Sequence, residues 1–195
     1  MFYIDIMTTY KYSQTWFLGS EIYKGLLNFV DVSKKNSVLE IGCFEGLSSV
    51  FFADNLLDHP DSTLTCVDPF MNIDNNDHTE FLMNNEEKNF DYNISNCKHT
   101  NKITVKKITS DDFFKVNTNM YNIIYIDGCH ECDFITRDME NAFRVLNPGG
   151  IMWMDDYHGG DGIQIRNTMN HFLFKYEGQY EIIHIGYQLA IKKLL

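Results

Sequence analysis

Short apolar stretches alternate along the chain with segments whose apolar residues recur every three or four positions. Two of these stretches, residues 123–126 and 151–154, are apolar on both faces, which is typical of strands buried between two layers of helices. Such alternation of strands and helices indicates β-α-β units built on a parallel sheet. We therefore predict an α/β fold with parallel strands at residues 37–41, 64–68, 103–108, 121–127 and 151–155.

The connecting segments carry helical patterns. Apolar residues between 135 and 146 fall on one helix face, and we expect this helix to end at the Pro-Gly-Gly sequence of residues 148–150. Further helices are predicted over residues 163–176 and, in an Asn-rich segment, near residues 80–96. Residues 180–185 and 188–192 are predicted to pair as antiparallel strands that close the sheet.

The segment ahead of the first strand is predicted to be a helix lying over the sheet, because it carries Trp16, Leu26, Leu27 and Val30. A length of 195 residues suits one domain. We divide that domain into an N-terminal helical cap region, residues 1–35, and a Rossmann-like core, residues 36–195.

Composition and charge limit the classes of partner that the chain is expected to bind. The net charge of −11 disfavours nucleic acid, because an acidic surface repels phosphates. No apolar run reaches the roughly 20 residues that span a bilayer, so we expect no membrane association. The first residues lack a basic segment followed by an apolar one, which predicts a cytoplasmic protein whose five cysteines stay reduced.

A turn with two glycines joins the first strand to the next helix, at residues 40–48 (EIGCFEGLS). Glycine lets the backbone approach a ligand closely, and the helix start favours an anionic group such as the carboxylate of a methionine. Phe44 stands where a dinucleotide-binding loop has its middle glycine, which argues against an NAD-dependent reductase. The predicted cofactor-binding residues of this turn are Glu40, Gly42, Phe44, Gly46 and Ser48.

Polar residues also follow the next strands. Asp68 ends the second strand, where a carboxylate can accept hydrogen bonds from a ribose diol. Ser110 and Asp111 follow the third strand, where they can meet an adenine amino group, and Asp127 ends the fourth. These elements, in this order, predict a binding site for S-adenosylmethionine. An isolated Asp at a strand end can also be only a helix cap.

The sequence resembles the class I S-adenosylmethionine-dependent methyltransferases, and within them the macrocin-type O-methyltransferases. The stretches that carry the resemblance are residues 40–48, 67–70 (VDPF), 126–130 (IDGCH), 146–150 (LNPGG) and 155–157 (DDY). The resemblance implies a Rossmann-like methyltransferase fold, with a seven-stranded, mostly parallel sheet and an antiparallel final strand. It also implies metal dependence, since the macrocin-type enzymes are metal-dependent and carry acidic residues at the positions of Asp127, Asp155 and Asp156.

Three aspartates are predicted to meet at one edge of the sheet. Asp127 ends the fourth strand, and Asp155 and Asp156 end the fifth, which is its neighbour about 4.8 Å away in this fold. Their mutual repulsion would be removed by a divalent cation, for which an all-oxygen site favours Mg²⁺, with Ca²⁺ or Mn²⁺ as alternatives. The cation would lower the pKa of the hydroxyl to be methylated. Alternatively, one aspartate caps a turn and no metal binds.

The sequence leaves the identity of the general base open, because Cys129 stands where the macrocin-type enzymes tend to have a second acidic residue. His130 is the first candidate and His158 the second, since the pKa of histidine lies near neutrality. We pair His130 with Asp127 as the predicted catalytic residues. A structural role for His130 in the loop is the alternative. Cys129 and Cys132 have the spacing of half a zinc site, but no second Cys-x-x-Cys pair follows.

The sequence therefore predicts an S-adenosylmethionine-dependent O-methyltransferase that acts, with Mg²⁺, on a hydroxyl of a small molecule such as a sugar or a catechol-like ring. One alternative is a non-catalytic protein that only binds S-adenosylmethionine. Another is a methyltransferase for a protein or an RNA cap. The sequence leaves the acceptor and the oligomeric state open, with a homodimer as one alternative.

Overall fold

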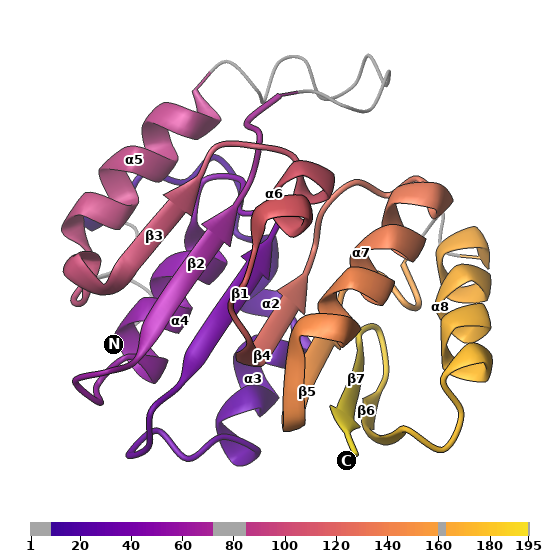
Figure 1. Cartoon of the computed structure of the whole chain (residues 1–195). Helices are drawn as coiled ribbons and strands as arrows, with labels where there is room; N and C mark the ends of the chain where they lie inside the picture. Colours follow the sequence, from indigo (N-terminus) through magenta and orange to yellow (C-terminus); the bar gives the residue numbers. More distant parts are fainter. Residues whose placement is uncertain (1–8, 72–84, 160–162, 195) are drawn as a thin grey trace.

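A computed structural model describes residues 9–71, 85–159 and 163–194, so residues 80–84 of one predicted helix lie outside the described residues. Seven strands form one sheet in the order β3-β2-β1-β4-β5-β7-β6 (Figure 1). The strands are β1 (Ser37–Ile41), β2 (Thr63–Val67), β3 (Ile103–Lys106), β4 (Tyr121–Ile126), β5 (Leu146–Met154), β6 (Tyr180–Ile185) and β7 (Leu189–Lys193). Strands β1 to β5 pair in parallel, whereas β7 is antiparallel to β5 and β6, which confirms the predicted sheet.

Helices cover both faces of the sheet. One face carries α3 (Glu21–Gly25), α4 (Leu47–Leu56) and α5 (Glu86–Asn96), and the other carries α6 (Ser110–Val116), α7 (Cys132–Val145) and α8 (Ile163–Lys175). Successive residues of the central strands enter opposite cores: Tyr125 and Trp153 pack under α3 and α4, whereas Ile124 and Met152 pack under α7. This alternation explains why β4 and β5 are apolar on both faces.

The connection from α7 to β5 differs from the prediction. The helix ends at Val145 and β5 begins at Leu146, so the Pro-Gly-Gly sequence of residues 148–150 lies within the strand. The pairing of β4 with β5 is irregular between Tyr121 and Ile123. Proline is tolerated beside such an irregularity because it has no N–H to donate to the ladder. Leu146 is buried in the strand, so its apolar character was equally compatible with a helix.

The N-terminal segment is not the single helix that we predicted. It forms the short helix α2 (Trp16–Gly19), then α3, then the 3₁₀ turn η1 (Leu26–Asn28). The side chain of Ser20 accepts a hydrogen bond from an N–H of α3 and starts that helix anew. Leu26 is buried, but Trp16 is 66% exposed and Leu27 44% exposed. The expectation that Trp16 and Leu27 pack on the sheet was therefore wrong.

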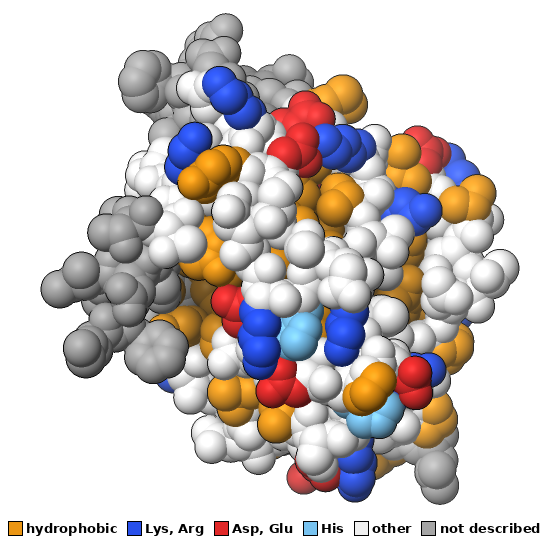
Figure 2. Space-filling view, turned by 90° about the vertical axis from the view of Figure 1, so that its left-hand side faces the viewer, with side chains coloured by type: hydrophobic (Ala, Val, Ile, Leu, Met, Phe, Trp, Pro, Cys, Tyr) orange, Lys and Arg blue, Asp and Glu red, His pale blue; other side chains and the backbone are white. Residues whose placement is uncertain are grey.

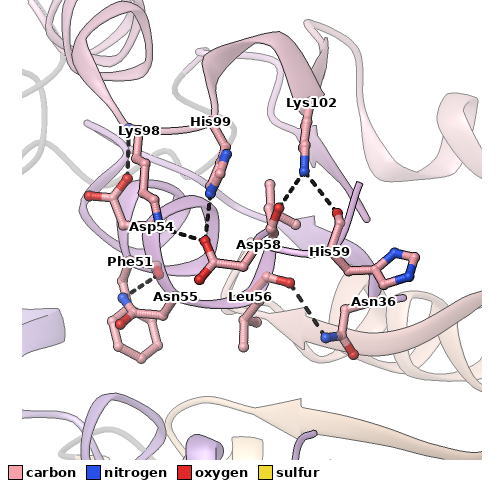
Figure 3. Close-up of polar contacts among 11 residues, drawn as sticks. Asn36, Phe51, Asp54, Asn55, Leu56, Asp58, His59, Lys98, His99 and Lys102 are labelled. Atoms are coloured by element: carbon pink, nitrogen blue, oxygen red, sulfur yellow. Dashed lines mark hydrogen bonds and ion pairs between the residues drawn. The ribbon is translucent and has the colours of Figure 1, made fainter. Parts of the chain in front are cut away.

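The C-terminal end of α4 is fixed by the connection between α5 and β3, which includes the 3₁₀ turn η2 (Thr100–Lys102) (Figure 3). Lys102 Nζ donates hydrogen bonds to the carbonyl oxygens of Leu57 and His59, at 2.5 and 2.8 Å. Lys98 Nζ lies 2.5 Å from Asp58 Oδ1. A cation near the last carbonyls stabilises a helix end. These contacts hold the helix whose other end follows the glycine turn.

Basic and acidic side chains are mixed on the face at the α5 and β3 end of the sheet (Figure 2). In this part of the molecule Lys107 Nζ pairs with Glu87 at 2.8 Å and with Asp91 at 3.0 Å. The positive charges on this face are therefore partly neutralised by acidic side chains of the same chain. Across the described residues, no helix combines the length and the apolar character that a membrane crossing requires.

Candidate functional site

The glycine loop, residues 42–46, joins β1 to α4 in a conformation that depends on its glycines. Gly42 and Gly46 have φ values of 82° and 81°. An ideal Cβ on Gly42 would stand 1.9 Å from the carbonyl oxygen of Asp127, so no side chain fits there. Phe44 also has a positive φ, 47°, which is strained for a bulky residue. Its ring is stacked by Trp16, with ring centroids 5.9 Å apart.

Asp68, directly after β2, binds the backbone of this loop. Its Oδ2 accepts hydrogen bonds from the N–H groups of Cys43 and Phe44, at 2.7 and 3.1 Å, and its Oδ1 accepts one from Phe70 at 2.8 Å. The carboxylate therefore holds the loop against the end of β2. A carboxylate has about four acceptor positions, so capacity remains for a further donor.

Glu40 and Ser48 lie beneath the loop and are both buried. Glu40 accepts hydrogen bonds from the hydroxyls of Ser48 and Ser49, the latter at 2.5 Å. Burial raises the pKa of Glu40 to about 7, although these hydrogen bonds oppose the rise. The pair thus ties β1 to the start of α4 rather than standing open to solvent.

The start of α6 carries the two residues that we predicted to meet an adenine. Ser110 and Asp111 are half-buried. The guanidinium of Arg137, on α7, binds the Asp111 carboxylate. Its Nε donates to both carboxylate oxygens, each at 3.1 Å. Asp111 is therefore already engaged by a cation of the chain, which sequence spacing could not show.

The structure brings the three predicted aspartates together. Ile126 of β4 is paired with Met154 of β5, so Asp127 and Asp155 follow adjacent positions of neighbouring strands. Together with Asp156 and His130 they form what we term the acid cluster. Burial and the charges of Asp155 and Asp156 raise the pKa of Asp127 well above its usual range. The cluster therefore repels itself, as the sequence predicted.

The two neighbouring aspartates have different surroundings. Asp155 Oδ1 accepts hydrogen bonds from Gln188 Nε2 at 2.8 Å and from the Asp156 N–H at 2.9 Å, and its Oδ2 accepts one from the Tyr125 hydroxyl at 3.0 Å. Asp127, His130 and Asp156, in contrast, each offer a ligand atom within 4.8 Å of one another. The geometry favours these three residues, rather than Asp155, as a place for a cation.

Asp156 is held from two sides. His130 Nε2 lies 3.0 Å from its Oδ2, and the Tyr187 hydroxyl donates to its Oδ1 at 2.6 Å. Burial would raise the pKa of Asp156, but the hydrogen bonds from His130 and Tyr187 leave it below its usual value. The backbone φ of Asp156 is 60°, and such strained conformations occur preferentially at functional sites.

Three residues of the site were missed from the sequence: Tyr125, Tyr187 and Gln188. The hydroxyl of Tyr125 lies 3.0 Å from both Asp127 Oδ2 and Asp155 Oδ2. Its position two residues before Asp127 on a strand was the available signal, since such residues share a face. No local signal marks Tyr187 and Gln188, which come from the turn between β6 and β7.

His158, the second candidate base, is exposed, and its Nδ1 lies 3.2 Å from Arg166. The structure thus places it beside a cation rather than on an aspartate. A second group that could hold an ion consists of Glu40, Cys43 and Cys66, all buried. Burial raises the pKa of both thiols, which disfavours the thiolates that a metal needs.

Comparison with known proteins adds a family and a fold. A family profile described as a methyltransferase domain matches residues 39–157. Among functionally curated proteins, none gives a significant match.

Solved structures with the same fold carry names of two kinds. The O-methyltransferase TomG from Streptomyces achromogenes, in complex with SAM, is 15% identical, with a TM-score of 0.64 over 93% of this chain and 81% of that one. The O-methyltransferase from Bacillus cereus, in complex with SAH, is 13% identical, with a TM-score of 0.65 over 100% and 88%. A Clostridium thermocellum protein provisionally named an rRNA methylase is 15% identical, with a TM-score of 0.70 over 91% and 96%.

Proposed function

The chain belongs to the methyltransferase-domain family, and on that premise we propose that it methylates a hydroxyl of a small molecule with S-adenosylmethionine and a divalent cation. The family match supports the class I S-adenosylmethionine-dependent methyltransferase that the sequence predicted, because it spans the glycine loop and all three aspartates. The observation that carries the finer proposal is the convergence of Asp127, His130 and Asp156 beside that loop.

We assign the methionine part of the cofactor to the glycine loop. Gly42, Phe44 and Gly46 set the loop's shape, and the start of α4 favours a carboxylate. The remaining acceptor capacity of Asp68 suits the ribose diol. Glu40 and Ser48 act from beneath, by joining β1 to α4, rather than by touching the cofactor.

We assign the adenine to the start of α6, beside Ser110. Asp111 has a weaker claim than the sequence indicated, because Arg137 binds it. Asp127 faces both parts of the site: its backbone carbonyl packs against Gly42, and its carboxylate belongs to the acid cluster. A methyl donor in the loop would therefore lie next to that cluster.

A divalent cation fits the acid cluster, because its donor atoms converge and its carboxylates repel each other. Asp127 and Asp156 would hold it, and it would lower the pKa of an acceptor hydroxyl. Mg²⁺ remains our first candidate, with Mn²⁺ favoured if His130 also binds, since imidazole suits transition metals. Asp155 supports the site by fixing Tyr125 and Gln188.

His130 is our candidate for the general base. His130 Nε2 lies 3.0 Å from Asp156 Oδ2, so the imidazole stands within the acid cluster, and the pKa of histidine lies near neutrality. In the proposed reaction the acceptor oxygen would bond to the methyl carbon as the carbon–sulfur bond breaks, and the hydroxyl proton would pass to the His130 imidazole. The main contribution of the chain is to hold both partners at bonding distance.

The test is calorimetric titration of the whole chain with S-adenosylhomocysteine and, separately, with Mg²⁺ and Mn²⁺. We expect Asp156→Asn to weaken cation binding by at least about tenfold, and the matched Asp155→Asn to weaken it less. Equal or reversed effects of the two variants would refute the cation assignment. Failure of the wild type to bind S-adenosylhomocysteine would refute the cofactor assignment.

The base and ligand roles of His130 are separated by His130→Ala. If His130 is a base that binds no cation, His130→Ala is expected to leave the cation affinity unchanged. The rate of methylation of hydroxylated acceptors is expected to fall by roughly 10²- to 10⁴-fold. A parallel loss of cation affinity would assign His130 to the metal instead.

Other acceptors and roles stay as outcomes of the same assays. The net charge of −11 and the mixed charges in Figure 2 weigh against an RNA cap as the acceptor. Binding of S-adenosylhomocysteine without turnover on any hydroxylated small molecule, protein or RNA would favour the non-catalytic alternative.

A further inference from the structure

One buried carboxylate lies behind the glycine loop and outside the acid cluster. Asp138, on α7, is 3% exposed, and in the part of the chain that the structure describes its Oδ1 is buried without a hydrogen-bond partner. Buried acceptors in native proteins are nearly always paired. An orphaned oxygen at such a place can accept a hydrogen bond that the described residues do not supply.

The surroundings of Asp138 connect it to the cofactor loop. Its Oδ2 lies 3.5 Å from the place that a Cβ on Gly128 would take. Gly128 in turn packs against the loop, since its Cα lies 2.8 Å from an ideal Cβ on Gly42. Burial raises the pKa of Asp138 to about 6, and a hydrogen bond from Ser110 opposes this rise. Asp138 thus lies between the loop and the start of α6.

Asp111, the acidic residue that the sequence predicted to meet the adenine, is already bound by another side chain. Arg137 binds both oxygens of Asp111 at 3.1 Å. Arg137 directly precedes Asp138 on α7, so the helix that engages Asp111 also supplies a second carboxylate beside Ser110. Asp111 is bound by Arg137 through both oxygens, whereas Asp138 has a buried oxygen with no partner among the described residues.

We propose that Asp138 recognises the adenine amino group of the cofactor by accepting its hydrogen bond at Oδ1. The inference rests on the proposed function, because the donor belongs to S-adenosylmethionine. The other donors of that molecule have other partners in our assignment: the ribose diol faces Asp68, and the methionine end faces the glycine loop. A site with a buried acceptor rejects a base that lacks the matching donor, since the acceptor then stays unpaired.

The experiment compares S-adenosylhomocysteine with its 6-deamino analogue, in which hydrogen replaces the amino group, by calorimetry. We expect the wild type to prefer the amino compound by at least about tenfold. Asp138→Leu keeps the branched shape of the side chain but replaces both oxygens with methyl groups, so it is expected to bind both ligands equally. Asp133→Asn, at an exposed carboxylate of the same helix, is the matched control and keeps the wild-type preference.

The outcomes separate this inference from the proposed function. No binding of S-adenosylhomocysteine to the wild type would refute the function itself. Equal binding of both ligands to the wild type would overturn only the inference. So would an Asp138→Leu variant that keeps the preference while both affinities fall. If circular dichroism shows Asp138→Leu to be unfolded, Asp138→Ala replaces it, and the wild-type preference still decides whether the amino group is recognised.

Discussion

Gly42 packs directly against Asp127, so closely that an ideal Cβ on Gly42 would stand 1.9 Å from the Asp127 carbonyl oxygen. This contact joins the loop after β1 to the end of β4. It sets the distance between the proposed cofactor site and the acid cluster.

Gly42→Ala is expected to lower the free energy of unfolding by about 4 kcal/mol or more, because it adds a backbone clash to an unfavourable φ. Gly149→Ala is the matched control: its φ is also positive, 76°, but nothing lies within 4 Å of the added Cβ. The control is expected to lose only about 1–2 kcal/mol. Urea unfolding of both variants checks this, and equal losses would contradict the packing described here.

Gln188→Leu is expected to lower the free energy of unfolding by about 3 kcal/mol or more, because it leaves several buried polar groups without partners. The Gln188 Oε1 accepts hydrogen bonds from the Ile22 N–H at 2.7 Å and from Trp153 Nε1 at 3.0 Å, and its Nε2 donates to Asp155. Gln179→Leu, at an exposed position, is expected to change stability by less than about 0.5 kcal/mol. Similar losses of stability in both variants would contradict the role of Gln188 in joining Ile22, Trp153 and Asp155.

Glu40→Gln is expected to remove a pH dependence of stability. The pKa of Glu40 is raised from 4.5 to about 7 by burial, so between these values the folded chain binds the proton more tightly than the unfolded chain does. The free energy of unfolding therefore falls as pH rises through this window, by about 3 kcal/mol from this group. Unfolding at pH 5 and pH 8 measures it. A variant with the wild-type slope would contradict the prediction, and exposed Glu181→Gln is the control.

Tyr125→Phe is expected to lower the free energy of unfolding by about 1–3 kcal/mol, because Asp127 and Asp155 lose a shared buried donor. Burial and the two negative charges raise the pKa of Tyr125 well above its usual range, so the hydroxyl keeps its proton. If a cation binds the cluster, saturating Mg²⁺ or Mn²⁺ is expected to reduce the loss. Thermal unfolding with and without the ion measures this, with Tyr92→Phe at an exposed position as the reference.

The sheet could be predicted because its strands are marked by local residue patterns. The predicted bounds of β1 and β6 are those of the structure. The start of β5 at Leu146 could not be predicted, since a buried leucine satisfies a helix and a strand equally. The exposure of Trp16 also contradicts the expectation from its apolar character, because its ring packs on Phe44 rather than on the sheet.

The site could be predicted as a set of strand ends but not as a set of open ligand atoms. Asp127, Asp155 and Asp156 meet because neighbouring strands end there. Whether an oxygen is already bonded depends on distant residues: Gln188 lies 33 positions after Asp155, and Arg137 lies 26 after Asp111. Periodicity carries no information about such partners.

The link between Ile22 and Gln188 has a further consequence, for the order in which the molecule folds. The two residues are 166 positions apart, and the neighbouring bond from the Gln188 N–H to Glu21 spans 167. Contacts between such distant residues form slowly, because the chain loses much freedom before they stabilise it. We therefore expect a refolding chain to assemble β1, β2 and β4 first and to orient Asp155 among the last steps.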